Sequence, residues 1–348
     1  MTDTRRALLA ALADGPVAGP ELADRLHVSR AAVWKQVESL REAGWGIESS
    51  DDGYRVVDVP EFGGAAIEFG LDAPFEIEFH DSIGSTNERA RELAGEGRKD
   101  VVVVADEQTA GRGRLDRGWS GPPGGIYTSI LIRPDVPPAH TPIFTLAAAV
   151  GVTRAAREAG VDASIKWPND VLVSSAEPEV TLAAGSKAAG DAANESQSDS
   201  SDDVLVLDNN AERGGKKLCG ILTEMEGEAD RVAWLIPGIG INANVVGDDL
   251  PDGATSLLLE RGEPVDRRIF TQRLLETFDE LRSDPESILD AWREHAATLG
   301  QRVRVETPGG EIVGEAVDVE FPGALIVETD DGERERVTAG DCEHLRPV

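Results

Sequence analysis

The sequence predicts a multidomain protein of mixed α/β (α+β) class, with an N-terminal winged helix, a central α/β domain and a C-terminal β-barrel. Helical patterns followed by an alternating segment occupy residues 1–58. Strand and helix patterns alternate over residues 67–298, and short strands separated by turn residues fill 299–348. At 348 residues, the chain is long enough for two or three domains and at least one substantial core.

The first 58 residues have the element order of a winged helix-turn-helix. Helices are expected over Thr4–Ala13, over Glu21–Leu26, and from Arg30 to about Gly44, the third capped by Ser29. Alternation over Ile47–Val57 around an Asp-Gly turn predicts the hairpin wing. Residues 59–66, with one proline and two glycines, are expected to form a linker.

The third of these helices carries the side chains that would face a DNA groove: Arg30, Trp34, Lys35 and Arg41. The domain holds seven basic and ten acidic residues, which is a poor electrostatic footprint for DNA. Two interpretations therefore stay open at this point. The domain binds operator DNA, or it is a winged helix used only for protein contacts.

The central domain alternates strands with helices. Closely spaced strands follow it, in the C-terminal part of the chain. Residues 174–215 break this pattern, because they are rich in Ala, Ser, Asp and Gly and poor in large apolar residues, so we predict a disordered acidic insertion in a hairpin loop. The expected strands are Phe75–His80, Val101–Ala105, Ile126–Ile132, Lys216–Glu224, Val232–Ile236, Val303–Val305, Gly314–Val319, Ala324–Val327 and Arg334–Val337, and the expected helices are Asn87–Ala94, Ile143–Ala159, Arg267–Leu281 and Ile288–Ala297.

The segment Gln108–Trp119, QTAGRGRLDRGW, is the most distinctive stretch of the chain. Its glycines allow close approach of the backbone to a ligand, and its arginines offer planar donors that suit carboxylate and phosphate oxygens. It is neither a Rossmann fingerprint nor a Walker loop. It binds a small anion, or it is a solvated surface loop or a basic contact for nucleic acid, and the motifs that follow favour the first.

Four further segments combine polar and glycine residues in patterns that local structure alone does not require. Ser85-Thr86-Asn87 begins a helix, where exposed amides and side-chain donors suit a small ligand. Lys166-Trp167-Pro168-Asn169-Asp170 places a proline within a strand pattern, and such local conflicts occur at functional sites. The other two segments are Lys217–Leu222 and Gly238–Asn242.

The charge is strongly negative, −31 from 65 acidic and 34 basic residues, and only six of the basic residues are lysine. Since acidic residues are spread along the whole chain, we expect adaptation to a high-salt cytoplasm. Two distant cysteines and five scattered histidines indicate neither a disulfide framework nor a zinc site, and a reducing cytoplasm is the expected compartment. No apolar run is long enough to span a membrane.

Taken in order, these motifs resemble those of the biotin–protein ligase family, in particular its long form that doubles as biotin operon repressor. The resemblance implies a catalytic domain like that of class II aminoacyl-tRNA synthetases and an SH3-like C-terminal barrel. It also implies a two-step reaction, in which biotin and MgATP give biotinyl-5'-AMP and a lysine of a biotin carboxyl carrier protein then takes the biotinyl group. The implied partners are that carrier protein, operator DNA and a second copy of the chain on ligand binding.

The resemblance assigns biotin or adenylate contacts to Ser85, Thr86, Asn87, Gln108, Arg112, Gly113, Arg114, Trp119, Asn169, Asp170, Lys217 and Asn242. The chemistry agrees with part of this set. Attack of a carboxylate on a phosphate brings two anions together, so positive charge must be supplied where negative charge accumulates. Arg112, Arg114, Lys166 and Lys217 are the candidates for catalysis, with Mg²⁺ on the phosphates and Asp170 as a candidate metal contact.

Two departures from the family pattern stand out. Asp116 lies within the arginine-glycine loop, where glycine is more usual, and the acidic insertion separates strands that the family joins by a few residues. The alternatives to a biotin ligase are a lipoate-type ligase of the same fold and a non-enzymatic, biotin-sensing DNA-binding regulator. Occupation of each expected position by a competent residue favours an active ligase.

Overall fold

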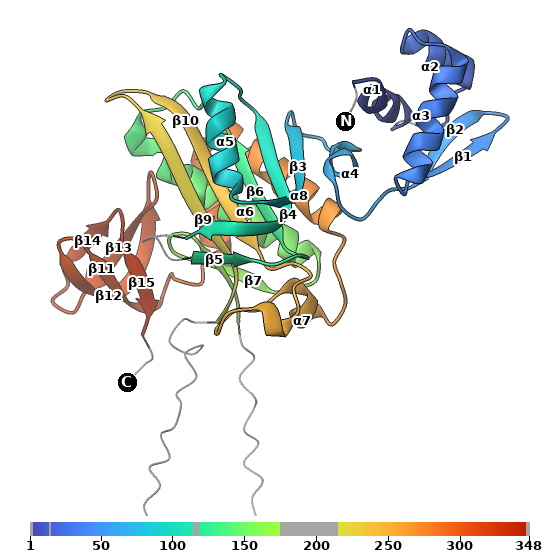
Figure 1. Ribbon diagram of the computed structural model, residues 1–348. Coiled ribbons are helices and arrows are strands. Elements are labelled where there is room, and N and C mark those ends of the chain that lie inside the picture. The colour runs from blue at the N-terminus through green and yellow to red at the C-terminus, as the bar shows by residue number, and fades with distance from the viewer. Residues whose placement is uncertain (1–2, 14, 114–117, 175–214, 346–348) are drawn as a thin grey trace, which may run out of the picture.

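The computed structural model describes residues 3–13, 15–113, 118–174 and 215–345 of the chain, and its two largest hydrophobic clusters form separate cores. One core fills the N-terminal domain, and the larger one runs from the central domain into the barrel. The central unit lies between the N-terminal domain and the barrel (Figure 1). None of the helices in the described ranges is long and apolar enough to cross a lipid bilayer.

The N-terminal domain has the expected winged-helix order of α1 (Asp3–Leu12), α2 (Gly19–Arg25), α3 (Arg30–Glu42), β1 (Gly46–Ser50) and β2 (Gly53–Asp58). Ser29 caps α3, because its hydroxyl accepts a hydrogen bond from Ala32 N. Val33, Val37 and Leu40 face the small core, as their helical spacing predicts. The opposite side of α3 is therefore left to solvent.

The predicted linker is partly helical, because α4 (Gly64–Glu68) occupies its end. This short helix contacts both cores: Ile67 is buried in the large one, whereas Ala65 and Phe69 pack against the small one. The ring of Phe69 meets Trp45 edge to face at 5.3 Å. A segment of low apolar content thus forms a seam between two domains, which composition alone does not reveal.

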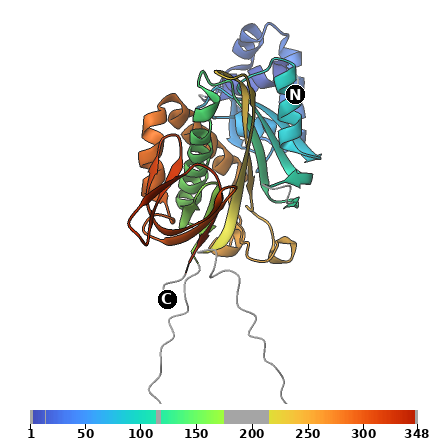
Figure 2. The same ribbon diagram turned by 90° about the vertical axis from the view of Figure 1, so that its left-hand side faces the viewer.

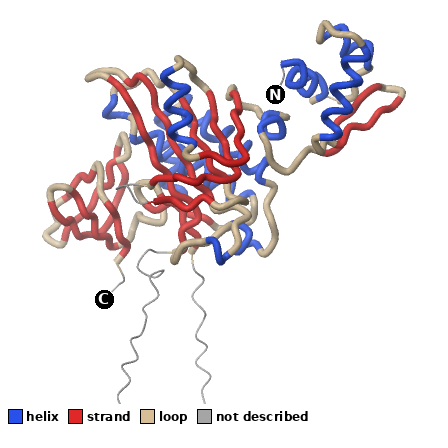
Figure 3. The backbone as a smooth tube through the Cα atoms, viewed as in Figure 1, coloured by secondary structure: helices blue, strands red, loops and turns tan. Residues whose placement is uncertain are grey.

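The central domain is built on an eight-stranded sheet with path β3-β4-β6-β10-β9-β8-β7, on which β5 pairs with β4 (Figures 1 and 3). Only the pair β3 and β4 is parallel. The strands are β3 (Glu76–Ile83), β4 (Val101–Arg112), β5 (Gly118–Gly121), β6 (Ile126–Leu131), β7 (Ala163–Lys166), β8 (Asp170–Val173), β9 (Lys216–Gly227) and β10 (Val232–Ile241). β4 and β10 extend well beyond the strands predicted there, so Gly111 and Arg112 lie on β4 and the Gly-Ile-Gly motif lies on β10, at the sheet and not on loops after it.

Helices cover the sheet unequally. α6 (Pro142–Glu158), α8 (Arg267–Ser283) and α9 (Pro285–His295) share the large core with Val102 and Val104 of β4. The alternate residues Val101 and Val103 form a smaller cluster with α5 (Thr86–Gly95) on the other face. α5 covers only part of that face, and the remainder carries the candidate site. The short helix α7 (Leu257–Arg261) follows β10.

The C-terminal unit, drawn in red tones in Figure 2, is a five-stranded antiparallel sheet, and its strand order is β14-β13-β12-β11-β15. Its strands are β11 (Arg302–Thr307), β12 (Gly310–Glu320), β13 (Ala324–Thr329), β14 (Arg334–Val337) and β15 (Asp341–His344), of which the last was not predicted. Thr298 Oγ1 receives a hydrogen bond from Trp167 N at 2.9 Å and lies 3.0 Å from His344 Nε2. The barrel is thereby joined to the Lys-Trp-Pro-Asn-Asp segment.

Of the predicted insertion, residues 175–214 lie outside the described ranges. The strands on either side of it, β8 and β9, are antiparallel neighbours in the sheet, with Val173 opposite Lys216. The insertion therefore connects two adjacent strands, as the sequence predicts for a hairpin loop.

Candidate functional site

A cavity of about 390 Å³ opens on the sheet face that α5 leaves uncovered, between α5, β4, β5, β9 and β10. This volume suits a small organic ligand. Most of the predicted ligand-binding residues line it: Ser85, Thr86, Asn87, Gln108, Arg112, Gly113, Trp119, Asn169, Asp170 and Lys217. Arg114 lies outside the described residues.

Glycines create the space for this cavity. Gly238 and Gly240 alternate with Ile239 and Ile241 on β10, and the two isoleucines enter the large core. The glycines therefore face the opposite side of the sheet, which is the cavity side. A methyl group added at Gly238 would lie 2.0 Å from Asn87 Oδ1, and one at Gly240 would lie 2.7 Å from Trp119 Nε1. Only residues without a side chain let Asn87 and Trp119 occupy their places.

Trp119 lies above this glycine surface, because a methyl group at Gly220 of the neighbouring strand would also be 2.8 Å from its ring. Within the described residues, its buried indole Nε1 has no hydrogen-bond partner. An unpaired buried donor is unfavourable, so this one is available to a ligand acceptor. Trp119 comes from β5, which pairs with β4 through Gly111 and Gln108.

A network of neutral side chains lies at the start of α5. Gln108 Oε1 accepts hydrogen bonds from the amide and the hydroxyl of Thr86, both at 2.9 Å. Ser129 Oγ lies 2.8 Å from Thr86 Oγ1 and 2.5 Å from Asn87 Oδ1. Ser85 is the helix cap, and its hydroxyl accepts a hydrogen bond from Glu88 N at 3.4 Å. Such a network offers fixed donors and acceptors to a polar, uncharged ligand group.

The three basic side chains among the described lining residues each have an acidic partner. Lys217 Nζ is 2.8 Å from Asp170 Oδ1, and Arg112 Nη2 is 2.8 Å from Glu88 Oε1. Arg91 forms an ion pair with Glu224, which also accepts a hydrogen bond from Asn87 Nδ2 at 2.8 Å. An anionic ligand must therefore replace carboxylates as partners of these cations, which the sequence did not indicate.

Two predicted side chains have other surroundings. Asn242 is buried and donates to the carbonyl of Thr255 at 3.0 Å and that of Lys217 at 3.5 Å, so it braces the strand behind the cavity and does not line it. Lys166 is also absent from the described lining. It is buried near His344 of the barrel, where burial and then the charge of Lys166 lower the pKa of His344 to about 4. The candidate catalytic contact of Lys166 is thus not supported.

In the N-terminal domain, Arg30, Trp34 and Lys35 are exposed on α3, and Trp34 retains 58% of its surface. Arg41 differs, since its guanidinium donates to the carbonyl of Ile47 at 2.9 and 2.6 Å and pairs with Glu38 at 2.7 Å. These contacts hold the wing against α3. They give Arg41 a structural role in place of the groove contact expected from sequence.

The motif search missed several lining residues. Glu88 had a local signal, because Ser85-x-x-Glu88 has the spacing of a capping box. Arg91 lies one helical turn beyond Asn87, and Glu224 ends the predicted strand Lys216–Glu224. Asp341 had none, because only the packing of the barrel on the central domain brings it to the cavity.

Comparison with known proteins identifies relatives of each part of the chain. Residues 80–242 match the biotin/lipoate A/B protein ligase family, residues 298–345 match the biotin protein ligase C-terminal domain, and residues 4–55 match a helix-turn-helix domain. The bifunctional ligase/repressor BirA of Bacillus subtilis is 35% identical over 346 residues, covering 94% of this chain and 93% of that protein. The chain belongs to the biotin protein ligase family.

Other members of the biotin protein ligase family are also similar. The biotin–[acetyl-CoA-carboxylase] ligase of Mycobacterium tuberculosis is 31% identical over 276 residues, covering 76% of this chain and 86% of that one. The biotin protein ligase of Aquifex aeolicus, solved in complex with biotin and ATP, superimposes with a TM-score of 0.57 at 23% identity over 77% of this chain and 99% of that one. The match to the Aquifex aeolicus structure supports the fold. The predicted three-part architecture is confirmed.

Proposed function

We propose that the protein is an ATP-dependent biotin–protein ligase that also acts as a biotin-responsive transcriptional repressor. One observation carries the ligase role. Five separate parts of the chain, beginning at Ser85, Gln108, Asn169, Lys217 and Gly238, line a single cavity with the residues of the family motifs. Membership of this family points to biotin and ATP as the substrates. A lysine of a carrier protein is the acceptor of the biotinyl group.

In the first step, a biotin carboxylate oxygen attacks the α-phosphorus of ATP, and pyrophosphate leaves. The carboxylate and the phosphate repel each other, and we assign the reduction of that repulsion to Lys217 and Arg112, two of the three described lining cations. In the second step, the carrier amine attacks the acyl carbon, AMP leaves, and an amide forms. The network of Thr86, Asn87 and Gln108 suits the neutral ring system of biotin, and Trp119 provides an apolar cover.

Mg²⁺ enters this proposal with the nucleotide. The described residues contain no group of three or more His, Cys, Asp or Glu side chains placed to hold a metal ion. The candidate contact, Asp170, is already paired with Lys217. The described residues therefore do not form a metal site of their own, and we assign no catalytic step to a protein-bound metal.

Incorporation of biotin into a carrier domain tests the ligase role. Purified protein is expected to attach one biotin to the carrier lysine, dependent on both ATP and biotin, and to catalyse biotin-dependent exchange of pyrophosphate with ATP. The assay should span low to molar salt, because the net charge of −31 supports our proposal of a high-salt cytoplasm. Exchange with lipoate or octanoate but not with biotin would identify a lipoate-type ligase, and biotin binding without exchange would identify a non-enzymatic sensor.

For the repressor role, we expect ligand-dependent binding of a palindromic operator by a dimer. The exposed Arg30, Trp34 and Lys35 on α3 support DNA binding, whereas the acidic excess of the domain opposes attraction at a distance. At about 1 M salt the Debye length is about 3 Å, which screens the distant acids and leaves direct contacts.

The expected result is binding that needs biotin or its adenylate and changes little with salt. Lys35→Ala should weaken it, whereas Arg25→Ala on α2 should not. Fluorescence anisotropy at several salt concentrations measures both. Absence of ligand-dependent binding at every salt concentration would reduce the domain to protein contacts and leave the ligase role intact.

A further inference from the structure

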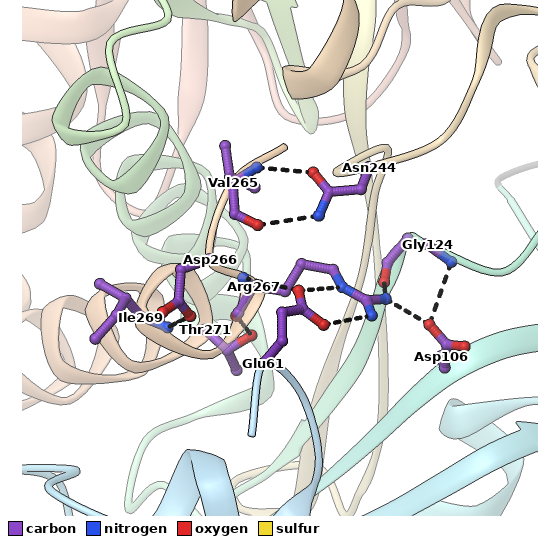
Figure 4. Close-up of polar contacts among 10 residues, drawn as sticks. Glu61, Asp106, Gly124, Asn244, Val265, Asp266, Arg267, Ile269 and Thr271 are labelled. Atoms are coloured by element: carbon purple, nitrogen blue, oxygen red, sulfur yellow. Dashed lines mark hydrogen bonds and ion pairs between the residues drawn. The ribbon is translucent and has the colours of Figure 1, made fainter. Parts of the chain in front are cut away.

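Arg267, the first residue of α8, contacts both Glu61 of the interdomain linker and Asp106 of β4 (Figure 4). Its guanidinium makes two hydrogen bonds to the carboxylate of Glu61, at 2.9 and 2.8 Å. It also forms an ion pair with Asp106 of β4 and donates to the carbonyl of Gly125 at 3.1 Å. The side chain is only 11% exposed and lies 4.2 Å from the ring centre of Phe62.

Asp106 and Gly125 lie at the base of a two-stranded flap, which we define as residues 108–113 and 118–121. Asp106 comes two residues before Gln108, where β4 turns toward the cavity, and its carboxylate also accepts from Gly124 N at 3.2 Å. Gly124 and Gly125 follow β5 and precede β6, and Asn244 N donates to the Gly124 carbonyl at 2.7 Å. Both strands of the flap are thus fixed at one point.

The flap carries Gln108, Arg112 and Trp119, three of the predicted ligand contacts, yet Arg267 does not line the cavity. Its influence must therefore pass through the backbone of β4 and the turn before β6. Burial of the Arg267 guanidinium opposes its charge, but the hydrogen bonds that it donates to Glu61 and Asp106 outweigh this and raise its pKa. The group is charged at every ordinary pH.

On its other side, Arg267 contacts the linker that leads to the N-terminal domain. Glu61 lies three residues after β2 and two before the cap of α4. α8 holds the same segment again through Gln272, whose amide donates to the carbonyls of Ile67 and Phe69 at 2.8 and 2.9 Å. One helix therefore supports both the linker and, through its first residue, the flap.

We propose that Arg267 is a positioning residue that couples the linker to the ligand site, by holding Glu61 on one side and the flap base at Asp106 on the other. The proposal extends the proposed function and rests on it only where ligand is used as a readout. The Arg267 guanidinium carries five N–H donors in one plane and makes four hydrogen bonds to Glu61, Asp106 and Gly125 at once, whereas a lysine ammonium has only three donors. Loosening either arm should change the other.

The first test measures the flap in the absence of substrate. In hydrogen–deuterium exchange, Arg267→Met should speed exchange of amides in residues 108–113 and 118–121, and Arg267→Lys should have an intermediate effect. Arg273→Gln, on the same helix but paired with Glu158 and Glu276, is the matched control. Unchanged exchange in the flap, in folded Arg267→Met protein, would overturn the proposal whether or not the protein is a biotin ligase.

The second test measures ligand. We expect Arg267→Met and the milder Asp106→Asn to raise the KM for biotin and shorten the lifetime of bound biotinyl-5'-AMP by about tenfold, with kcat changed by no more than about threefold. A general loss of stability would instead lower the concentration of active enzyme and leave KM unchanged. Inactive wild-type protein would contradict the proposed function, and the exchange experiment would then decide this inference alone.

The coupling between the linker and the flap is tested with Glu61→Gln, which changes the linker carboxylate and no residue of the flap. It should speed flap exchange and raise the KM for biotin about two- to threefold in wild-type protein but have no effect in the Arg267→Met background. Equal effects of Glu61→Gln in both backgrounds would show that Arg267 does not connect the two arms. If Arg267→Met fails to fold, the pair Glu61→Gln and Asp106→Asn provides the same test through the non-additivity of their effects.

Discussion

Replacing Lys217 by alanine is expected to lower the rate of biotinyl-5'-AMP formation by about 10- to 150-fold, the equivalent of losing a charge-assisted contact of about 1.5–3 kcal/mol. Lys217 lines the cavity, and its ammonium group lies 5.4 Å from the centre of the Trp119 ring. Its removal has a second consequence, because Asp170 then stands unpaired where an anion must bind.

A double variant separates the loss of the Lys217 charge from the effect of the unpaired Asp170 carboxylate. In the double variant Lys217→Ala/Asp170→Asn, the repulsive carboxylate is absent as well, so part of the lost rate should return. Lys216→Ala is the matched control, since the neighbouring lysine does not line the cavity. Single-turnover formation of the adenylate is the measurement. An unchanged rate in Lys217→Ala, or equal loss in Lys216→Ala, would rule out the proposed role of Lys217.

The sequence allowed the three-part fold and most of the site to be predicted, because both depend on local patterns. The order of helices and hairpin in the first 58 residues and the closely spaced strands at the end are local signals. The Gly-Ile-Gly motif was recognised but expected to follow the strand Val232–Ile236, and only its place on β10 sets both glycines on one face of the sheet. Ten of the twelve predicted ligand contacts line one cavity.

The contacts that could not be predicted depend on packing between distant segments. Lys166 ends a strand that the barrel covers, and no pattern near it signals that the lysine is buried near His344. Asn242 follows the last residue of β10, where the chain turns away from the cavity to bond Thr255. Arg267 stands in an ordinary amphipathic helix, more than 150 residues from its partner Asp106.

The second large effect concerns a residue with no reactive group. We expect Gly238→Ala to reduce biotin-dependent adenylate formation by about 100-fold, because displacement of ligand-positioning groups by about 1 Å can have an effect of that size. The added methyl group would lie 2.0 Å from Asn87 Oδ1 and 2.7 Å from its Cγ, so Asn87 must move. Asn87 would then lose its contacts with Ser129 and Glu224, and the neutral network at the start of α5 would open.

Gly95→Ala is the matched control, because it lies at the end of α5 with no atom within 4 Å of an added methyl group. It should leave the rate unchanged, and alanine there should favour the helix slightly. The thermal midpoint of both variants separates a local defect from unfolding, since a folded Gly238→Ala protein that binds biotin poorly has lost its site and not its core. Normal adenylate formation by Gly238→Ala would mean that Asn87 can move aside without loss, and that the close contact between β10 and α5 is not what positions the ligand.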